Sequence, residues 1–152
     1  MMKFNHNFDG AWLGGNFQQK LGNIMIMRMA EVYLIAAEAT LRSTGDGAAA
    51  AGYFNELRKR ACRNPADYNV GTGMQLVTAT MNDVFDEYAR ELCGEYSRWA
   101  ILKRNKAFET RLQTYNKTAF INFVATKHYN RPIPFTFLNQ INNADEFGTN
   151  GY

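Results

Sequence analysis

One segment of the chain, residues 28–42, constrains the fold more than any other. It reads RMAEVYLIAAEATLR. Its charged residues are separated by three, seven and four positions, at Arg28, Glu31, Glu38 and Arg42. These spacings place the charges on one narrow stripe of an α-helix. Because almost every other position is apolar, we expect this helix to be buried on most of its sides.

A second helix is expected directly after the first. Residues 43–47, Ser-Thr-Gly-Asp-Gly, end the first helix, because glycine readily adopts the left-handed backbone of a tight turn. Beyond the turn, charged residues take one side of the chain and apolar residues recur on the other, at Ala50, Phe54, Leu57 and Ala61. Two helices joined by so short a turn lie antiparallel, so we predict a helical hairpin.

The hairpin partly matches the tetratricopeptide repeat pattern, which places bulky and small residues at fixed offsets over two helices. Ala50 and Phe54 fall on its second-helix Ala-x3-Phe pair. Glu38 stands where the pattern has glycine, and the closing proline is displaced. The match is incomplete but correctly ordered.

Two further helices are predicted downstream of this hairpin. The third runs from about Thr80 to Cys93, with Thr80 and Asp83 forming an approximate capping box, and Gly94 interrupts it. The fourth continues as a single helix through Trp99 towards Leu112. Two hairpins are fewer than the three repeats that such stacks usually need, so neighbouring structure must complete the core.

The flanking segments lack a sustained period. Residues 1–24 form an irregular segment, and residues 25–152 form a helical domain with a loop-rich tail. Within the tail, residues 120–124 suggest a short strand, and residues 131–134 are extended because proline restricts the backbone. The predicted fold is therefore mainly α: tetratricopeptide-like antiparallel helical hairpins with irregular, loop-rich flanks.

Composition and motifs exclude several classes of function. The net charge of +3 is mild and spread along the chain, which argues against nucleic acid, and residues 58–60 and 103–106 are interpreted as solvated outer faces of helices. No run approaches the ~20 apolar residues of a membrane span. The two histidines lack a second ligand at metal spacing, no phosphate-binding loop occurs, and no cofactor is indicated. The cysteines Cys62 and Cys93 are interpreted as buried thiols that do not decide the compartment.

A cluster of charges occupies the third and fourth helices. Glu87, Glu91 and Glu95 lie four apart on one helix face and repel one another unless they are paired. Nearby cations that can bridge them to another helix are Arg90, Arg98 and Arg104. Acid–base catalysis by these carboxylates is the less favoured interpretation, because helical spacing is typical of a salt-bridged face.

Three blocks of the sequence resemble the SusD/RagB family. Residues 28–39 resemble its Arg-x-Ala-Glu-x-x-Leu-x-x-Ala-Glu-Ala helix, followed by residues 54–61, which resemble its Leu-Asn-x-x-Arg-x-Arg-Ala motif. Residues 87–104 resemble its Glu-Arg-x-x-Glu-Leu-x-x-Glu-Gly-x-Arg-Trp-x-Asp-Leu-x-Arg block. Residues 132–134 and 150–152 are similar to its Pro-Ile-Pro and terminal Asn-x-Gly-Tyr. The order and spacing of these blocks make the resemblance specific to the family's C-terminal portion.

The chain departs from the family pattern at three positions. Tyr88 replaces arginine, Tyr96 replaces glycine and Ile101 replaces aspartate. These departures bear on a local salt-bridge network rather than on the resemblance. The charged residues of all three blocks, with Trp99, are interpreted as a scaffold network: Arg28, Glu31, Glu38, Glu87, Arg90, Glu91, Glu95, Arg98, Trp99 and Arg104.

The resemblance implies a non-enzymatic glycan-binding protein at the outer-membrane surface that delivers nutrient to a SusC-like TonB-dependent transporter. It also implies membrane association only through a lipid anchor, which, with the export signal, belongs to an upstream part that this sequence lacks. This chain would supply mainly the helical scaffold. The alternative is a helical-repeat module that binds a peptide or protein in its groove.

Sugar recognition in such proteins uses exposed aromatic rings stacked on the apolar faces of the sugar. The candidates are Trp12, in a glycine-rich loop, and Tyr68, in a Pro-Asp loop. Each has an alternative interpretation as an aromatic residue packed against its own loop. Trp99 lies on the helical stripe with Leu102 and is expected in the core. The incomplete stack further predicts that the chain is marginally stable or associates through the exposed face of the helix over residues 28–42.

Overall fold

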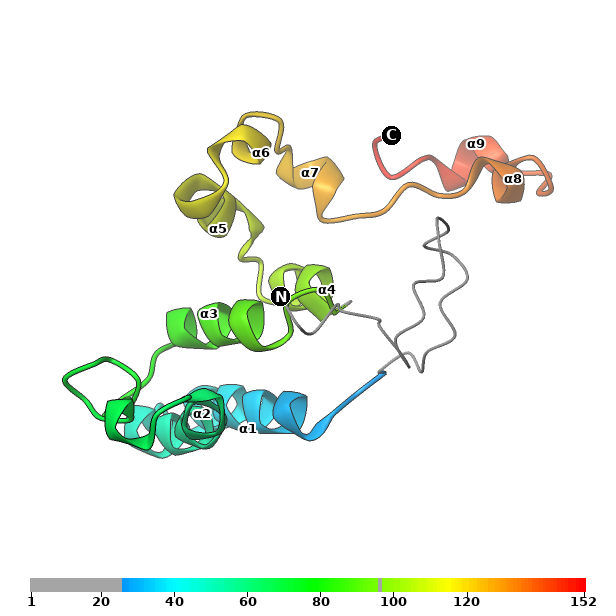
Figure 1. Cartoon of the computed structure of the whole chain (residues 1–152). Helices are drawn as coiled ribbons and strands as arrows, with labels where there is room; N and C mark the ends of the chain where they lie inside the picture. The colour runs from blue at the N-terminus through cyan, green and yellow to red at the C-terminus, as the bar shows by residue number, and fades with distance from the viewer. Residues whose placement is uncertain (1–25, 96) are drawn as a thin grey trace, which may run out of the picture.

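Figure 1 shows a computed structural model of the chain, which describes residues 26–95 and 97–152. These residues contain helices and no strand. The elements are α1 (Met29–Ser43), α2 (Gly47–Ala61), η3 (Pro65–Asp67), α3 (Met81–Glu91), α4 (Ser97–Arg104), α5 (Phe108–Tyr115), α6 (Lys117–Ile121), α7 (Ala125–His128), α8 (Phe135–Leu138) and α9 (Ala144–Phe147). The mainly helical fold with loop-rich flanks is confirmed.

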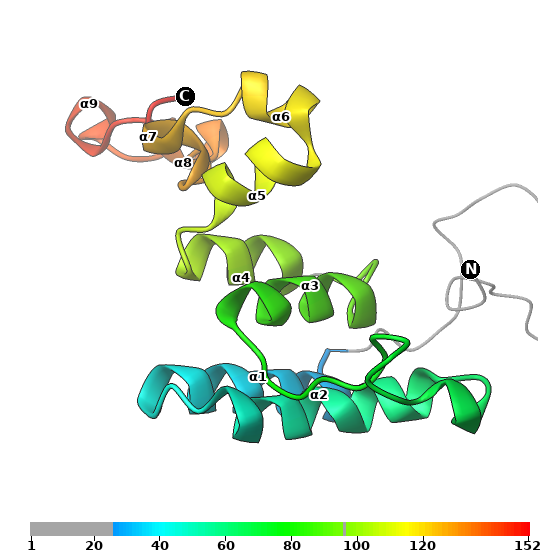
Figure 2. The same cartoon turned by 90° about the vertical axis from the view of Figure 1, so that its left-hand side faces the viewer.

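Helices α1 and α2 form the predicted hairpin (Figures 1 and 2). The turn depends on Gly45, whose φ of 70° lies in the left-handed region that glycine favours. The Asp46 carboxylate accepts a hydrogen bond from the Ala49 N–H at 2.9 Å and caps α2. Gly47 lies against the chain that enters α3, because a Cβ there would come within 2.7 Å of the Ala79 carbonyl oxygen.

The hydrophobic core lies where α3 packs over the hairpin, as Figure 2 shows. The largest fully buried side chains are Leu34 of α1, Phe54 of α2, and Val84 and Tyr88 of α3. At the start of α3 the Asp83 carboxylate accepts hydrogen bonds from the N–H and the hydroxyl of Thr80. The apolar stripes of three helices thus meet in a single core, with Ala37 and Ala50 small enough to let α1 and α2 approach closely.

The expectation that α1 is buried on most of its sides is wrong. Met29, Val32 and Ile35 are 68%, 45% and 42% exposed, whereas the charged Glu38 is only 2% exposed. The carboxylate is buried because arginines of α1 and α4 pair with it. An apolar strip (Met29, Val32 and Ile35) is therefore left on the outer face of α1.

The predicted fourth helix is two helices, α4 and α5. The chain turns at Lys106, whose φ is 50°, and the Ala107 N–H donates to the Leu102 carbonyl at 2.9 Å. The predicted strand over residues 120–124 is also wrong. That segment lies partly in α6, whose first turn is capped by the Asn116 side chain. Residues 131–134 lie outside helices, as expected from their prolines.

Helices α5–α9 lie on the far side of α3 and α4 from the hairpin (Figure 1). They are short, and Arg111 is the single buried residue among those described beyond Ala107. Aromatic contacts hold this region together, with the Phe108 ring centroid 5.4 Å from that of Tyr129 and 6.1 Å from that of Phe123. None of the described helices combines the length and apolarity that crossing a membrane requires.

Candidate functional site

A network of ion pairs ties the hairpin to α3. Arg28, which precedes α1, reaches Glu91 with Nη1 at 2.5 Å and Glu95 with Nη2 at 3.1 Å. Its Nη2 also donates to the Glu91 backbone carbonyl at 2.6 Å. Arg60, near the end of α2, contacts the same Glu91 carboxylate at 2.7 Å. Cations from the start of α1 and the end of α2 therefore neutralise acidic residues that would otherwise repel each other.

A second group of pairs surrounds Glu87, which is 5% exposed. Arg58 of α2 approaches this carboxylate with Nη2 at 2.8 Å and also donates to the Gly73 carbonyl at 3.1 Å. Arg90, one helical turn further along α3, contacts it at 2.6 Å. A carboxylate so well paired is held as a structural element, which leaves no free acid–base pair at this position.

A third group surrounds Glu38 in the middle of α1. Arg42 Nε lies 2.9 Å and Arg104 Nη2 lies 2.5 Å from its carboxylate. The adjacent Tyr88 hydroxyl is buried and has no hydrogen-bond partner within the described residues. Burial, together with the charge of Glu38, raises the pKa of Tyr88 to about 12. This tyrosine therefore stays neutral in a core that is lined by charges.

The remaining members of the predicted scaffold network are placed as follows. Arg98 donates to the Phe85 carbonyl at 2.7 Å, and burial lowers the pKa of its guanidinium group. Glu31 is half-buried and makes no ion pair within the part of the chain that the structure describes. Trp99 is half-buried rather than in the core, because it lies at the end of the stack where α5 turns away.

Several residues of the network were not foreseen from the sequence. Arg58 and Arg60, interpreted as part of a solvated face, are paired with acids of α3. Arg111 of α5 pairs with Asp86 of α3. The helical period does contain a signal for Arg58, because it lies four residues after Phe54 and so borders the buried side of α2.

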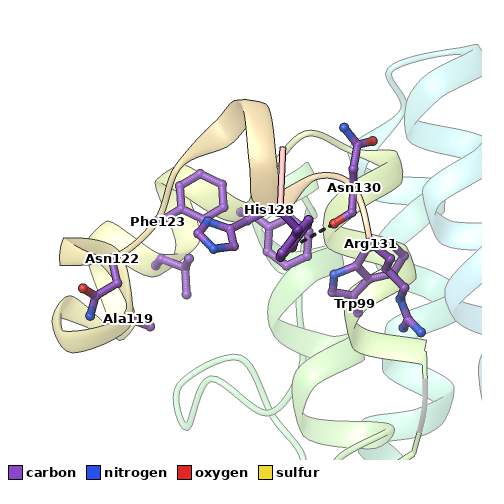
Figure 3. Close-up of a pocket in the computed structure, with 10 residues that line it drawn as sticks. Trp99, Ala119, Asn122, Phe123, His128, Asn130 and Arg131 are labelled. Carbon is purple, nitrogen blue, oxygen red and sulfur yellow. Dashed lines mark hydrogen bonds between the residues drawn. The ribbon is translucent and has the colours of Figure 1, made fainter. Parts of the chain in front are cut away.

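Two clefts open in the C-terminal region. The first, of about 420 Å³, lies between α4, α5 and the segment around α7 (Figure 3). Its lining includes aromatic rings, an imidazole, two amides and a guanidinium group, from residues such as Trp99, Phe123, His128, Asn122, Asn130 and Arg131. The sequence alone does not indicate this cleft, because its residues come from distant parts of the chain.

The rings of the first cleft are held in place by one another and by cations. Phe123 and His128 are stacked with their centroids 5.6 Å apart, and His128 Nδ1 accepts from the Val124 N–H at 2.8 Å. Arg131 Cζ lies 4.4 Å from the centroid of the Trp99 ring. This arrangement presents planar apolar surface beside hydrogen-bonding groups, which suits the binding of a polar organic ligand.

Of the two sequence-predicted ligand residues, Tyr68 lines neither cleft. Trp12 falls outside the described residues. Tyr68 follows η3 in a loop and is half-buried. Cys62 and Cys93 are free thiols, but the interpretation that both are buried is wrong, because Cys62 is half-buried and Cys93 is exposed. Among the described residues, no group of His, Cys, Asp or Glu is arranged to hold a metal ion.

Comparison with known proteins gives a consistent family match. The profile of the SusD family matches residues 1–146. The chain is 32% identical over 124 residues to SusD-like protein P2 of Formosa agariphila, which covers 80% of the chain and 24% of that protein. It is 35% identical over 133 residues to the starch-binding protein SusD of Bacteroides thetaiotaomicron, covering 86% of the chain and 22% of that protein.

The chain thus spans less than a quarter of the length of these curated relatives. No solved structure gives a significant match.

Proposed function

The chain belongs to the SusD family, and on that premise we propose that it is part of a non-enzymatic glycan-binding protein at the outer-membrane surface that passes nutrient to a SusC-like TonB-dependent transporter. The family match over residues 1–146 carries this proposal. It is supported by a relative that is named a starch-binding protein. The helical fold with its tetratricopeptide-like hairpin agrees with such a role.

The contribution of this chain is mainly a rigid scaffold. The ion pairs of Glu38, Glu87 and Glu91 join α1, α2, α3 and α4, and they involve the charged blocks that resemble the family. Pairs of this kind contribute orientation more than net stability, because burying charges has a large desolvation cost. We propose that this network keeps the helices in register so that loops and neighbouring segments present the glycan site.

The paired carboxylates also favour binding over catalysis. A general acid or base needs a side chain that is free to exchange a proton with the substrate. Glu87 and Glu38 are each held by two arginines and are almost completely buried. Glycan hydrolysis at these positions is therefore not part of the proposal.

The second candidate function is a helical-repeat module that binds protein. The apolar strip of α1 favours it, because exposed apolar strips on helices often mark protein contacts. The two candidates differ in their ligand. A glycan would engage loops and clefts, whereas a peptide or protein would cover α1.

Affinity electrophoresis of the purified chain in gels that contain soluble neutral or acidic polysaccharides tests the proposal. We expect at least one polysaccharide to retard the chain without release of reducing ends. Loss of retardation in Trp12→Ala or Tyr68→Ala would locate the site on the predicted residues. Phe135→Ala, which removes an aromatic side chain that is 73% exposed, is the control.

Two results would contradict the proposal. Release of reducing ends would indicate an enzyme. Peptide binding along α1, with no retardation by any polysaccharide, would favour the protein-binding module and confine this chain to scaffold and docking roles.

A further inference from the structure

We propose that the two C-terminal clefts together bind an acidic saccharide, one that carries carboxylate or sulfate groups. This inference rests on the proposed function for the saccharide class and adds both a site and a charge. The second cleft, of about 440 Å³, is lined by Lys103, Lys106, Thr126, Tyr129 and Asn130 among others. Asn130 lines both clefts, so they are neighbours on one surface.

The charged side chains that line the two clefts are cationic. Among the described residues, no aspartate or glutamate side chain lines either cleft, whereas Arg131, Lys103 and Lys106 do. These three cations are exposed and make no ion pair within the described residues. A cluster of cations without acidic partners beside two clefts attracts an anionic ligand and raises its rate of association.

Cations lie over two aromatic rings of the first cleft, those of Trp99 and Tyr152. Arg131 Cζ and Lys103 Nζ lie 4.4 Å and 4.8 Å from the centroid of Trp99, and Lys127 Nζ lies 4.4 Å from that of Tyr152. Cation–π contacts of this kind restrain the positions of the charged groups. Neutral sugars need a free ring face for stacking. Cations already lie over the rings of Trp99 and Tyr152, so at these two rings a ligand gains most by binding the cations.

The hydrogen-bonding groups of the first cleft complete the match. A guanidinium group such as that of Arg131 binds a carboxylate or sulfate with two parallel hydrogen bonds. Asn122 and Asn130 are exposed, and their side chains line the first cleft (Figure 3). Within the described residues these side chains hydrogen-bond only through Nδ2, which donates to the carbonyls of Thr118 and Thr126, so their amide oxygens are available to sugar hydroxyls. The volume of about 420 Å³ lies within the ~300–1,000 Å³ range of small-molecule sites.

The test uses affinity electrophoresis of the whole chain against polygalacturonate, carrageenan, neutral galactan and a single-stranded oligonucleotide. Polygalacturonate carries carboxylates and carrageenan carries sulfates, so the first two arms separate the sources of acidity. We expect retardation by at least one acidic polysaccharide, and an affinity at least tenfold lower in Arg131→Gln. Retardation should weaken as salt is added, because exposed charges are screened. Arg131→Lys should restore part of the affinity, since it keeps the charge but loses the planar fork.

Arg63→Gln is the matched control. Arg63 is an exposed arginine after α2, it makes no ion pair among the described residues, and its removal changes the net charge equally. We expect its affinity to change less than twofold. An unchanged circular dichroism spectrum would show that both variants keep the fold.

Four outcomes would overturn the inference. Equal losses in Arg131→Gln and Arg63→Gln would indicate attraction by net charge alone. Retardation by galactan alone, insensitive to Arg131, would leave the proposed function standing but remove this site. Arg131-dependent retardation by the oligonucleotide alone would assign the surface to nucleic acid. Retardation by none would remove the site and confine the chain to a scaffold.

Discussion

The arginines that join the hairpin to α3 and Arg131 of the C-terminal region have opposite surroundings. Around the hairpin and α3, the guanidinium groups of Arg28, Arg58 and Arg60 lie against carboxylates. In the C-terminal region, Arg131 lies on the ring of Trp99 and has no acidic partner among the described residues. Arginines that pair with carboxylates join the helices, and their positive charge is neutralised and therefore not available to a ligand. Unpaired cations supported by rings remain available, which separates scaffold from candidate binding surface.

The two halves also differ in how they exclude water. The hairpin and α3 share a core with fully buried Leu34 and Phe54. The region beyond Ala107 buries Arg111 alone among its described residues, and its aromatic rings meet near the surface. Since buried apolar area dominates folding stability, the first half should carry most of the stability of the chain.

The largest expected effect tests that difference in core packing. Phe54→Ala should lower the free energy of unfolding by about 4 kcal/mol, because it removes a fully buried ring and leaves a cavity. Phe135→Ala, at a side chain that is 73% exposed, should change it by less than about 0.5 kcal/mol. Urea unfolding followed by circular dichroism measures both. Similar losses in the two variants would show that the halves contribute equally.

A smaller loss is expected when a paired carboxylate of the scaffold is removed. Glu87→Ala should cost about 3 kcal/mol, because Arg58 is then left almost buried without its carboxylate. The control is Glu109→Ala on α5, where the glutamate is exposed and has no ion pair within the described residues. If urea unfolding shows the two variants to be equally stable, the network is not structural.

The pH dependence of the core gives a third test. Burial raises the pKa of Tyr88 to about 12 from an ordinary value of 10.0, so folding favours the neutral hydroxyl. The resulting stabilisation is complete below pH 10 and is lost as the pH rises towards 12, amounting to about 2 kcal/mol. Unfolding of wild type and Tyr88→Phe between pH 9 and about 12 measures it. Parallel curves for the two proteins would contradict the assignment.

The smallest effect on stability is expected on the apolar strip of α1. The double variant Met29→Gln, Ile35→Gln should alter the free energy of unfolding by less than about 0.5 kcal/mol, because both side chains are exposed. It should, however, reduce self-association of the chain in sedimentation experiments at increasing concentration. A wild-type chain that stays monomeric and unfolds in one sharp transition would overturn the expected association.

Local features of the fold were predictable from the sequence. The α1–α2 hairpin was recognised because the period of its apolar residues and the turn at Gly45 are encoded within a few residues. The break between α4 and α5 was missed because Lys106 is neither glycine nor proline, yet it adopts a positive φ. The strand expected over residues 120–124 was wrong for a similar reason, since short apolar runs are compatible with either helix or strand.

The contacts that form the candidate sites could not be predicted from the sequence. The acidic residues of α3 indicated a salt-bridged face, but their partners Arg28 and Arg58 lie 63 and 29 residues away from Glu91 and Glu87. Periodicity gives the face of a helix on which a charge lies, and it does not give the helix that packs against that face. The same limit applies to the clefts, which bring Trp99 together with Arg131 and Tyr152.

The sequence by itself therefore determined the helical class, the hairpin and the family, because these depend on local periodicity and on motifs in order. The tertiary structure alone decided that the charged stripe of α1 turns towards α4, so that Glu38 is buried and Val32 is exposed. It also decided which cations beside the clefts have no acidic partner among the residues that the structure describes. The physical reason is that burial and charge pairing depend on distances between residues far apart in the chain, which close only when the helices pack.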